Sequence, residues 1–272
     1  MHHSVNPLSF IRTLVRNRHL TWQMTKREVM GRYRGSILGL FWSFFNPIFM
    51  LAIYTFVFSV VFKAKWGASH SDSKTEFAII LFAGLIVFNL FSEVVNRAPS
   101  LILSNVSYVK KVVFPLEVLP VIAIGSSLFH ALVSVIVLLA FNGMVNQVFP
   151  LSALLLPVVL LPLFALTLGF AWLLASLGVF LRDVGQTVGI LTTALMFLSP
   201  IFFPASALPE SIRGYLFLNP LTFIIEQVRK VLILGQFPDW QGLGLSLLAY
   251  GFFAWLGFAW FQKTRKGFAD VL

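Results

Sequence analysis

Residues 32–62 of the chain read RYRGSILGLFWSFFNPIFMLAIYTFVFSVVF, and this stretch decides the fold. After Arg34 it contains 28 consecutive residues without a charge. Because a helix needs about 20 apolar residues to cross roughly 30 Å of hydrocarbon, the stretch predicts a membrane span with a basic flank. Pro47 in its middle removes one backbone donor and predicts a bend in the helix.

The composition of the whole chain also indicates a membrane protein. Of its 272 residues, 58% are hydrophobic and 11% are charged, and the mean hydropathy is +0.88. Soluble domains are about 25% charged, so soluble enzymes are excluded. The net charge of +10 would indicate nucleic acid in a soluble protein. Here the basic residues border apolar spans, which is typical of membrane topology, and no nucleic-acid partner is expected.

Apolar stretches predict six membrane-spanning helices, at roughly 37–62, 77–95, 118–141, 151–180, 186–203 and 243–261. The fourth is overlong for a straight crossing, so either Pro157 and Pro162 kink it or its ends project beyond the bilayer. The predicted fold class is an all-α integral membrane protein. Residues 1–272 form a single transmembrane domain, in which 1–36 make a cytoplasmic interface region.

The basic leader before the first span is amphipathic. Wound as a helix, it places Trp22, Val29 and Tyr33 on one side and Arg27 roughly opposite. Such a helix lies in the membrane interface, with its rings toward the acyl chains and its arginines at the lipid phosphates. A plain anchor that follows the positive-inside rule is the alternative.

The lysines and arginines predict the orientation of the chain. With the N-terminus inside, fourteen of the 20 lie on the inner side and six on the outer side. The positive-inside rule therefore places both termini in the cytoplasm.

Two connecting segments carry polar residues. The first predicts a short amphipathic helix that begins at Pro99, a favourable start, and ends near Lys110-Lys111. The second, residues 204–241, contains a helix from Pro220 that sets Glu226 and Arg229 on one face. This helix is too short and too charged to span, so it either lies at the interface or re-enters the membrane between spans five and six.

The spans carry little chemistry of their own. Carboxylates fall only at span ends, and His130 is the one ionisable residue deep in a span. We expect it to be neutral and hydrogen-bonded to Ser126, Ser127 or Ser134, with a proton relay as the alternative. No Ser/His/Asp set, metal-ligand spacing or P-loop occurs in the sequence. The prediction is no catalytic residue, no metal and no cofactor in this chain.

Five motifs, in order, point to a family. They are KREVMGRYRGSILGLFWSFFNPIFMLAIYTFVFSVVF, SNVSYVKKVVFPLEVLP, SLGVFLRDVGQ, MFLSPIFFP and LNPLTFIIEQVRKVLILG, and together they extend over most of the chain, from about residue 20 to 235. This set resembles the permease subunit of bacterial ABC-2 type exporters, most closely the polysaccharide branch that exports O-antigen.

The resemblance implies a homodimer of six-span subunits in the bacterial inner membrane. Each subunit binds a separate cytoplasmic ABC ATPase, two copies in all, and the ATPase binds ATP and Mg. The implied substrate is a glycan on a lipid diphosphate carrier, usually undecaprenyl diphosphate. The chain itself would be a permease and not an enzyme.

The resemblance also implies roles for the two connecting segments. The first would be a coupling helix that docks on the ATPase, through Ser104, Asn105, Tyr108, Lys110 and Lys111. For the two lysines, positive-inside topology is an alternative explanation. The second segment would form an outer gate that includes Asn219, Pro220, Glu226 and Arg229. A surface ion pair between the last two is the alternative.

A helical wheel divides the rings of the first span into two faces. One face, about 120° wide, contains Gly35, Gly39 and Asn46 together with the aromatic residues Trp42, Phe45, Phe49 and Phe56. We interpret these four rings as the lining of the glycan path, because flat rings stack on sugars. The alternative is helix packing through Gly35-x-x-x-Gly39, with the rings facing lipid.

Three arginines before the first span, Arg27, Arg32 and Arg34, suit the carrier diphosphate, since guanidinium forks match phosphate oxygens. Anchoring to anionic membrane lipids is an equal alternative. The function that follows is export of lipid-linked polysaccharide, O-antigen first. Alternatives are an ABC-2 permease for capsule, teichoic acid, drug or lipid, and a polytopic membrane enzyme that acts on lipid-linked sugars.

Overall fold

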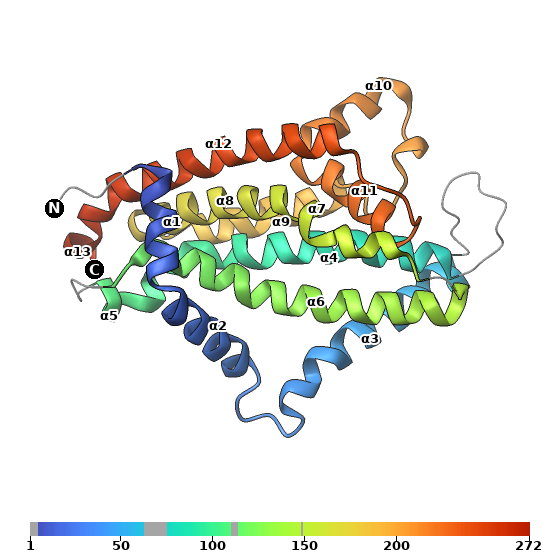
Figure 1. Cartoon of the computed structure of the whole chain (residues 1–272), viewed down its shortest axis with the longest axis horizontal. Coiled ribbons are helices and arrows are strands. Elements are labelled where there is room, and N and C mark those ends of the chain that lie inside the picture. The colour runs from blue at the N-terminus through green and yellow to red at the C-terminus, as the bar shows by residue number, and fades with distance from the viewer. Residues whose placement is uncertain (1–4, 63–74, 110–113, 148) are drawn as a thin grey trace.

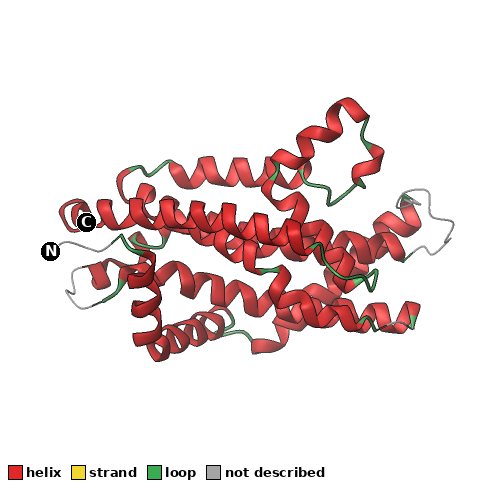
Figure 2. Cartoon of the chain, turned by 45° about the horizontal axis from the view of Figure 1, so that its top comes forward, coloured by secondary structure: helices red, strands yellow, loops and turns green. Residues whose placement is uncertain are grey.

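The computed structural model describes residues 5–62, 75–109, 114–147 and 149–272, which form helices, turns and loops without a strand (Figure 2). The helices are α1 (Pro7–Arg16), α2 (Arg18–Arg32), α3 (Trp42–Tyr54), α4 (Glu76–Arg97), α5 (Val106–Val109), α6 (Leu119–Asn146), α7 (Leu156–Val159), α8 (Leu161–Phe180), α9 (Val184–Leu198), α10 (Glu210–Arg213), α11 (Pro220–Leu232), α12 (Trp240–Thr264) and α13 (Phe268–Val271). The all-α prediction is confirmed for this part of the chain.

Within the described residues, five helical stretches are long and apolar enough to cross a membrane. They are Gly39–Phe58, Glu76–Ser100, Leu116–Asn146, Leu151–Phe180 and Trp240–Val271, and they overlap five of the six predicted spans. The remaining predicted span, 186–203, coincides with α9, which has only 15 residues. At 1.5 Å per residue α9 is about 22 Å long, shorter than the hydrocarbon core. The count of six is therefore not confirmed.

Helix α4 is the centre of the bundle. It packs against α3, α6, α8, α9 and α11, and Figure 1 shows it running between α6 and the α8–α9 pair. Helix α12 lies along α8, where a Cβ on Gly257 would come within 2.4 Å of the Gly169 carbonyl oxygen. Small residues of this kind let two membrane helices approach closely.

The fourth span is interrupted near its two prolines, which agrees with the first of the two predicted alternatives. The helical stretch is divided at Leu160 into α7 and α8, with Pro157 and Pro162 near the start of each. Proline is tolerated in the first turn of a helix, where its missing N–H has no partner in any case.

The leader forms two helices, α1 and α2, which join at Asn17. Helix α1 places Phe10 against Trp172 and Phe258, with ring centroids 4.9 and 5.5 Å apart, and α2 packs on α6. A turn then leads to α3, which leans away from the bundle (Figure 1). Helices α1, α5 and α13 lie at one end of the bundle, called the basic end below, and α10 and α11 lie toward the other.

The prediction of one amphipathic helix from Pro99 is wrong for the described residues. The chain instead forms 3₁₀ turns at Ala98–Ser100 and Leu103–Asn105, followed by the single turn of α5. At Asn105 the backbone N–H bonds the Ile102 carbonyl, while the side-chain amide takes the Leu101 carbonyl at 2.8 Å. The side chain thus occupies the acceptor that an α-helix would give to the backbone.

Candidate functional site

A cavity of about 730 Å³ lies between α3, α4 and α6, beside the end of α2. This volume is within the range of small-molecule binding sites. Its polar and aromatic walls are Arg32, Tyr33, Ser36, Trp42, Ser43, Asn46, Tyr54, Phe82, Asn89, Ser92, Glu93, Asn96, Ser127, His130 and Ser134. The cavity is the candidate functional site.

One wall of the cavity is a polar stripe on the most buried helix of the bundle. Between Phe77 and Val95, α4 is buried except at Asn89 and Glu93, and Asn96 follows as the next exposed residue. The spacing of four and then three residues places these side chains on one helix face, and all three line the cavity. The side-chain amide oxygen of Asn96 accepts a hydrogen bond from the Thr192 hydroxyl on α9 at 2.9 Å.

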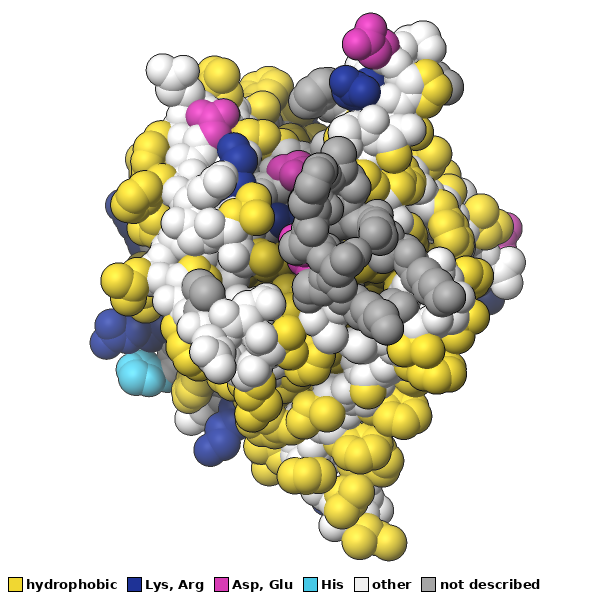
Figure 3. Space-filling model, turned by 90° about the vertical axis from the view of Figure 1, so that its right-hand side faces the viewer, with side chains coloured by type: hydrophobic (Ala, Val, Ile, Leu, Met, Phe, Trp, Pro, Cys, Tyr) yellow, Lys and Arg dark blue, Asp and Glu magenta, His cyan; other side chains and the backbone are white. Residues whose placement is uncertain are grey.

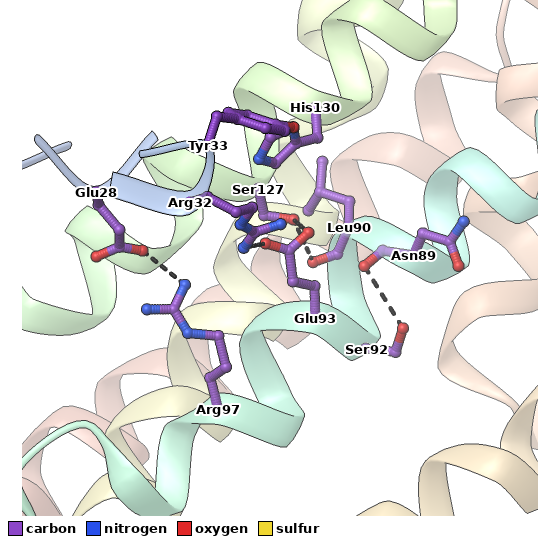
Figure 4. Close-up of polar contacts among 10 residues, drawn as sticks. All are labelled: Glu28, Arg32, Tyr33, Asn89, Leu90, Ser92, Glu93, Arg97, Ser127 and His130. Atoms are coloured by element: carbon purple, nitrogen blue, oxygen red, sulfur yellow. Dashed lines mark hydrogen bonds and ion pairs between the residues drawn. The ribbon is translucent and has the colours of Figure 1, made fainter. Parts of the chain in front are cut away.

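An ion pair between α2 and α4 lines the cavity at the end of α2. Arg32 bonds Glu93, and the two side chains are 37% and 23% exposed (Figure 4). Ser127 on α6 supports the carboxylate, because its hydroxyl lies 3.3 Å from Glu93 Oε2 and 3.2 Å from the Leu90 carbonyl. A second pair, Arg97–Glu28 at 2.6 Å, joins the same two helices.

His130 lies beside this ion pair, but its partner differs from the prediction. Its Nδ1 is 3.2 Å from the Tyr33 hydroxyl, and Ser134 instead donates to the His130 backbone carbonyl at 2.9 Å. Nε2 is buried and has no hydrogen-bond partner among the described residues. Partial burial raises the pKa of the Tyr33 phenol, while the nearby Arg32 lowers it, so the phenol stays protonated.

Of the four predicted path aromatics, Trp42 lines the cavity, together with Asn46. Phe45 contacts Trp42 edge-on at 5.2 Å and stacks with Phe49 at 5.8 Å, and neither phenylalanine lines the cavity. Phe56 is 60% exposed and belongs to a π-helical segment, Thr55–Val61. The wider π turn shifts the helix phase, so the predicted face is not continuous.

The glycine-packing alternative for this span is wrong within the described chain. Gly35 and Gly39 precede α3 and have positive φ angles of 87° and 52°. A Cβ at either position would meet nothing within 4 Å among the described residues. These glycines therefore shape the turn between α2 and α3.

The three arginines assigned to the carrier diphosphate do not lie together at the cavity. Arg32 lines it, whereas Arg27 and Arg34 are exposed residues outside its lining. Only Arg32 is placed to act on a ligand inside the cavity, and it is already paired with Glu93.

The residues assigned to the outer gate are found at the start and middle of α11. Asn219 caps the helix by accepting from the Leu221 N–H at 2.9 Å and donates to Ser199 Oγ at 2.8 Å. Tyr250 on α12 donates to the Pro220 carbonyl at 2.9 Å. The start of α11 is thus fixed to the end of α9 and to α12.

Arg229 is buried whereas the Glu226 side chain is 41% exposed, so their pair reaches the surface at the carboxylate end only. Arg229 is 4% exposed and donates to the carbonyls of Ile80 and Ile201 at 3.1 and 3.3 Å, as well as to Glu226 at 3.0 Å. A Cβ on Gly84 would lie 3.0 Å from its guanidinium. The arginine therefore joins α4, the turn after α9 and α11.

The predicted coupling segment lies at the basic end. Ser104 is exposed, and Tyr108 stacks on Phe114 with centroids 4.4 Å apart. Lys110 and Lys111 lie outside the described residues. Beside this segment, Arg265 bonds Glu117 at 2.5 Å and the Phe114 carbonyl at 3.0 Å, which ties the end of α12 to the start of α6.

The sequence prediction missed the stripe of α4. It sought ionisable residues deep in a span and did not weigh Asn89, although an amide inside an apolar span is a signal of the same kind. It placed Glu93 at a span end without naming a partner. The Arg32–Glu93 pair joins residues 61 positions apart, and no local sequence pattern predicts such a contact.

A bundle of apolar spans around a polar cavity is characteristic of a multi-pass membrane transport protein. A profile of the ABC-2 type transporter matches residues 19–233, and the chain belongs to that family. The family predicted from the five motifs is therefore confirmed.

Known relatives cover nearly the whole chain. It is similar to the O-antigen export system permease protein RfbA of Myxococcus xanthus, with 28% identity over 267 residues, 97% of this chain and 100% of that protein. A protein of the same name from Klebsiella pneumoniae is 24% identical over 250 residues, 92% of this chain and 93% of that protein. The polysialic acid transport protein KpsM of Escherichia coli is 25% identical over 225 residues, 82% of this chain and 84% of that protein.

Proposed function

We propose that this chain is the permease subunit of an ATP-driven exporter that moves polysaccharide, carried on a lipid diphosphate, across the bacterial inner membrane. The observation that carries the proposal is the cavity between α3, α4 and α6, whose lining of polar and apolar side chains includes Trp42 and Arg32. Rings stack on sugar faces, and a guanidinium suits the phosphates of a carrier. The names of the relatives favour O-antigen as the glycan.

A separate ABC ATPase supplies the energy in this proposal, with its nucleotide and magnesium bound outside this chain. The segment with Ser104, Asn105 and Tyr108 lies at the basic end, which is the cytoplasmic side if both termini are inside. Lys110 and Lys111 continue it in sequence. Its exposed polar side chains and Tyr108 form the docking surface for the ATPase.

A second copy of the chain completes the conduit. Helix α3 buries only Ser43, Pro47 and Leu51, and α9 buries only Val188 and Thr192. Hydrophobic side chains cover the protruding lower part of the molecule in Figure 3, the part that carries α3 in Figure 1. We assign these faces to the partner copy and to lipid.

The absence of cysteine from the sequence makes the homodimer simple to test. Ile190 on α9 is 72% exposed, so Ile190→Cys should give an oxidant-dependent dimer of the full chain in membranes. Leu154, which is 80% exposed and precedes α7, is the matched control and should remain monomeric. Dimers from Leu154→Cys alone would place the partner on a different face.

The experiment that tests the function removes the chain from the organism that produces it. Surface polysaccharide should disappear while lipid-linked glycan accumulates inside, and the same result should follow when the partner ATPase loses its P-loop lysine. Unchanged surface polysaccharide after deletion would contradict the proposal. Loss of capsule with intact O-antigen would support a second candidate, capsule export, which the similarity to KpsM favours.

Arg32 has its own test, because its structural and ligand roles can be separated. Glu93→Gln and Arg32→Gln each remove the ion pair, whereas the double variant Arg32→Glu/Glu93→Arg rebuilds it in reverse. If Arg32 also holds the diphosphate, the reversed pair should restore protein abundance but not export. Export at the normal level from the reversed pair would show that Arg32 only links α2 to α4.

A further inference from the structure

Two side-chain amides face the cavity without any partner in the described chain. Asn46 on α3 and Asn89 on α4 both line it and are both exposed, and neither amide makes a hydrogen bond to another described residue. Each lies within a stretch long and apolar enough to span the membrane. An amide without a hydrogen bond is costly in hydrocarbon, so these positions require water or a polar ligand.

The two amides lie inside their apolar stretches, away from the ends. Asn89 is eight residues from Arg97, the end of α4, and Asn46 is seven residues from Gly39, the start of its span. At 1.5 Å per residue they lie about 12 and about 10 Å from these ends. Both amides are therefore interior to their helices, and Asn89 is one helix turn from Glu93 of the Arg32–Glu93 pair.

The chemistry of the pair selects the class of ligand. A carboxamide offers one acceptor oxygen and two N–H donors, so two of them suit a ligand whose groups both donate and accept. Hydroxyl groups have this property, whereas a free anion requires donors alone and a cation requires acceptors alone. Trp42 lies on the same wall as Asn46, one helix turn away, and supplies a flat apolar surface.

We propose that Asn46 and Asn89 form a sugar-binding station, in which the two amides hydrogen-bond the hydroxyls of a passing sugar unit while Trp42 contacts its face. This inference rests on the proposed function and adds a site within it. The carrier diphosphate at Arg32 and the first sugar at the amides would lie one helix turn apart along α4, from Glu93 to Asn89. The station therefore binds the sugar nearest the carrier.

Photo-crosslinking in living cells tests the site directly. The full chain, with its partner ATPase present, would carry a diazirine amino acid at position 89 in cells that make the polysaccharide. Illumination should give a high-mass adduct that stains for sugar. Leu256 on α12 is the control, since it is 46% exposed, lies eight residues from Thr264, the end of α12, and is not among the residues that line the cavity. It should give no sugar adduct.

Export kinetics provide the second measurement. Asn89→Leu should slow the appearance of surface polysaccharide about five-fold, the factor expected for one neutral hydrogen bond, while Asn89→Gln, which keeps the amide, should retain most of the rate. Equal membrane abundance of the two variants excludes a folding defect. If Asn89→Leu is poorly folded, the crosslinking experiment still tests the site, because it does not use that variant.

The outcomes separate this inference from the proposed function. Normal export with no sugar adduct at position 89 would overturn the station and leave the exporter intact. An adduct between position 89 and a second copy of the chain would also overturn it, because the amides would then be covered by protein. Unchanged surface polysaccharide after deletion of the chain would overturn the proposed function itself.

Discussion

Replacing Glu117 by leucine should lower the stability of the folded chain by a large amount. Among the ion pairs of the described residues, Arg265–Glu117 is the one in which both side chains are well buried. Their exposed fractions are 14% and 9%. Removing one partner of a buried pair costs about 3–5 kcal/mol, because the remaining charge is left without compensation. For a chain of this size that loss corresponds to a fall of about 6 to 20 °C in Tm.

The matched control is the same substitution in a half-buried, more solvated pair. Glu28 and Arg97 are 24% and 37% exposed, so Glu28→Leu should cost no more than about 1 kcal/mol. The assay is thermal unfolding of the detergent-purified protein, followed by the fluorescence of its seven tryptophans. The double variant Glu117→Leu/Arg265→Leu should recover more than half of the loss, since it leaves no unpaired charge.

Equal shifts for Glu28→Leu and Glu117→Leu would refute this reasoning, because burial would then have no influence on the cost. A double variant as unstable as Glu117→Leu alone would also refute it. The loss would in that case come from packing at the start of α6 and not from the stranded guanidinium of Arg265.

Three further predictions concern single positions. Gly257→Ala should destabilise by about 1–3 kcal/mol through overpacking, whereas Gly251→Ala, with open space around it, should be neutral or stabilising in the same unfolding assay. Gly84→Ala should destabilise less in an Arg229→Met background than in the native chain, a coupling above about 0.5 kcal/mol, because the added methyl group meets the guanidinium. His130→Gln should leave export of surface polysaccharide within about five-fold of normal, since the loss of one hydrogen bond is worth about 1 kcal/mol; abolished activity would favour a membrane enzyme.

The sequence was sufficient for the features that depend on local composition. Hydropathy located five helices long enough to span, and the prolines at 157 and 162 located the break between α7 and α8. The 15-residue α9 shows the limit of this reasoning, because the length of an apolar run does not determine how many of its residues form a helix. The run from Leu198 to Pro204 instead turns away through Ser199-Pro200.

The candidate site was predicted less completely, for two physical reasons. A helical wheel assumes one uninterrupted helix, and the first span has a 3₁₀ turn before Trp42 and a π segment after Tyr54. The prediction therefore identified Trp42 and Asn46 but extended the face too far in both directions. The opposite wall depends on which side of α4 its neighbours leave open, and this is decided by packing between segments distant in sequence.

The two walls of the cavity differ in how firmly they are held, and this difference limits how the cavity can widen. Helix α4 is surrounded by five helices and buried on every side but the Asn89 stripe, so moving it would disrupt most of the core. Helix α3 is attached through the narrow row of Ser43, Pro47 and Leu51. Because few buried contacts make a segment inexpensive to displace, a wider cavity is reached at lower free energy by moving α3. When α3 moves to admit a ligand, it carries the amide of Asn46 with it. The amide of Asn89 on α4 stays fixed.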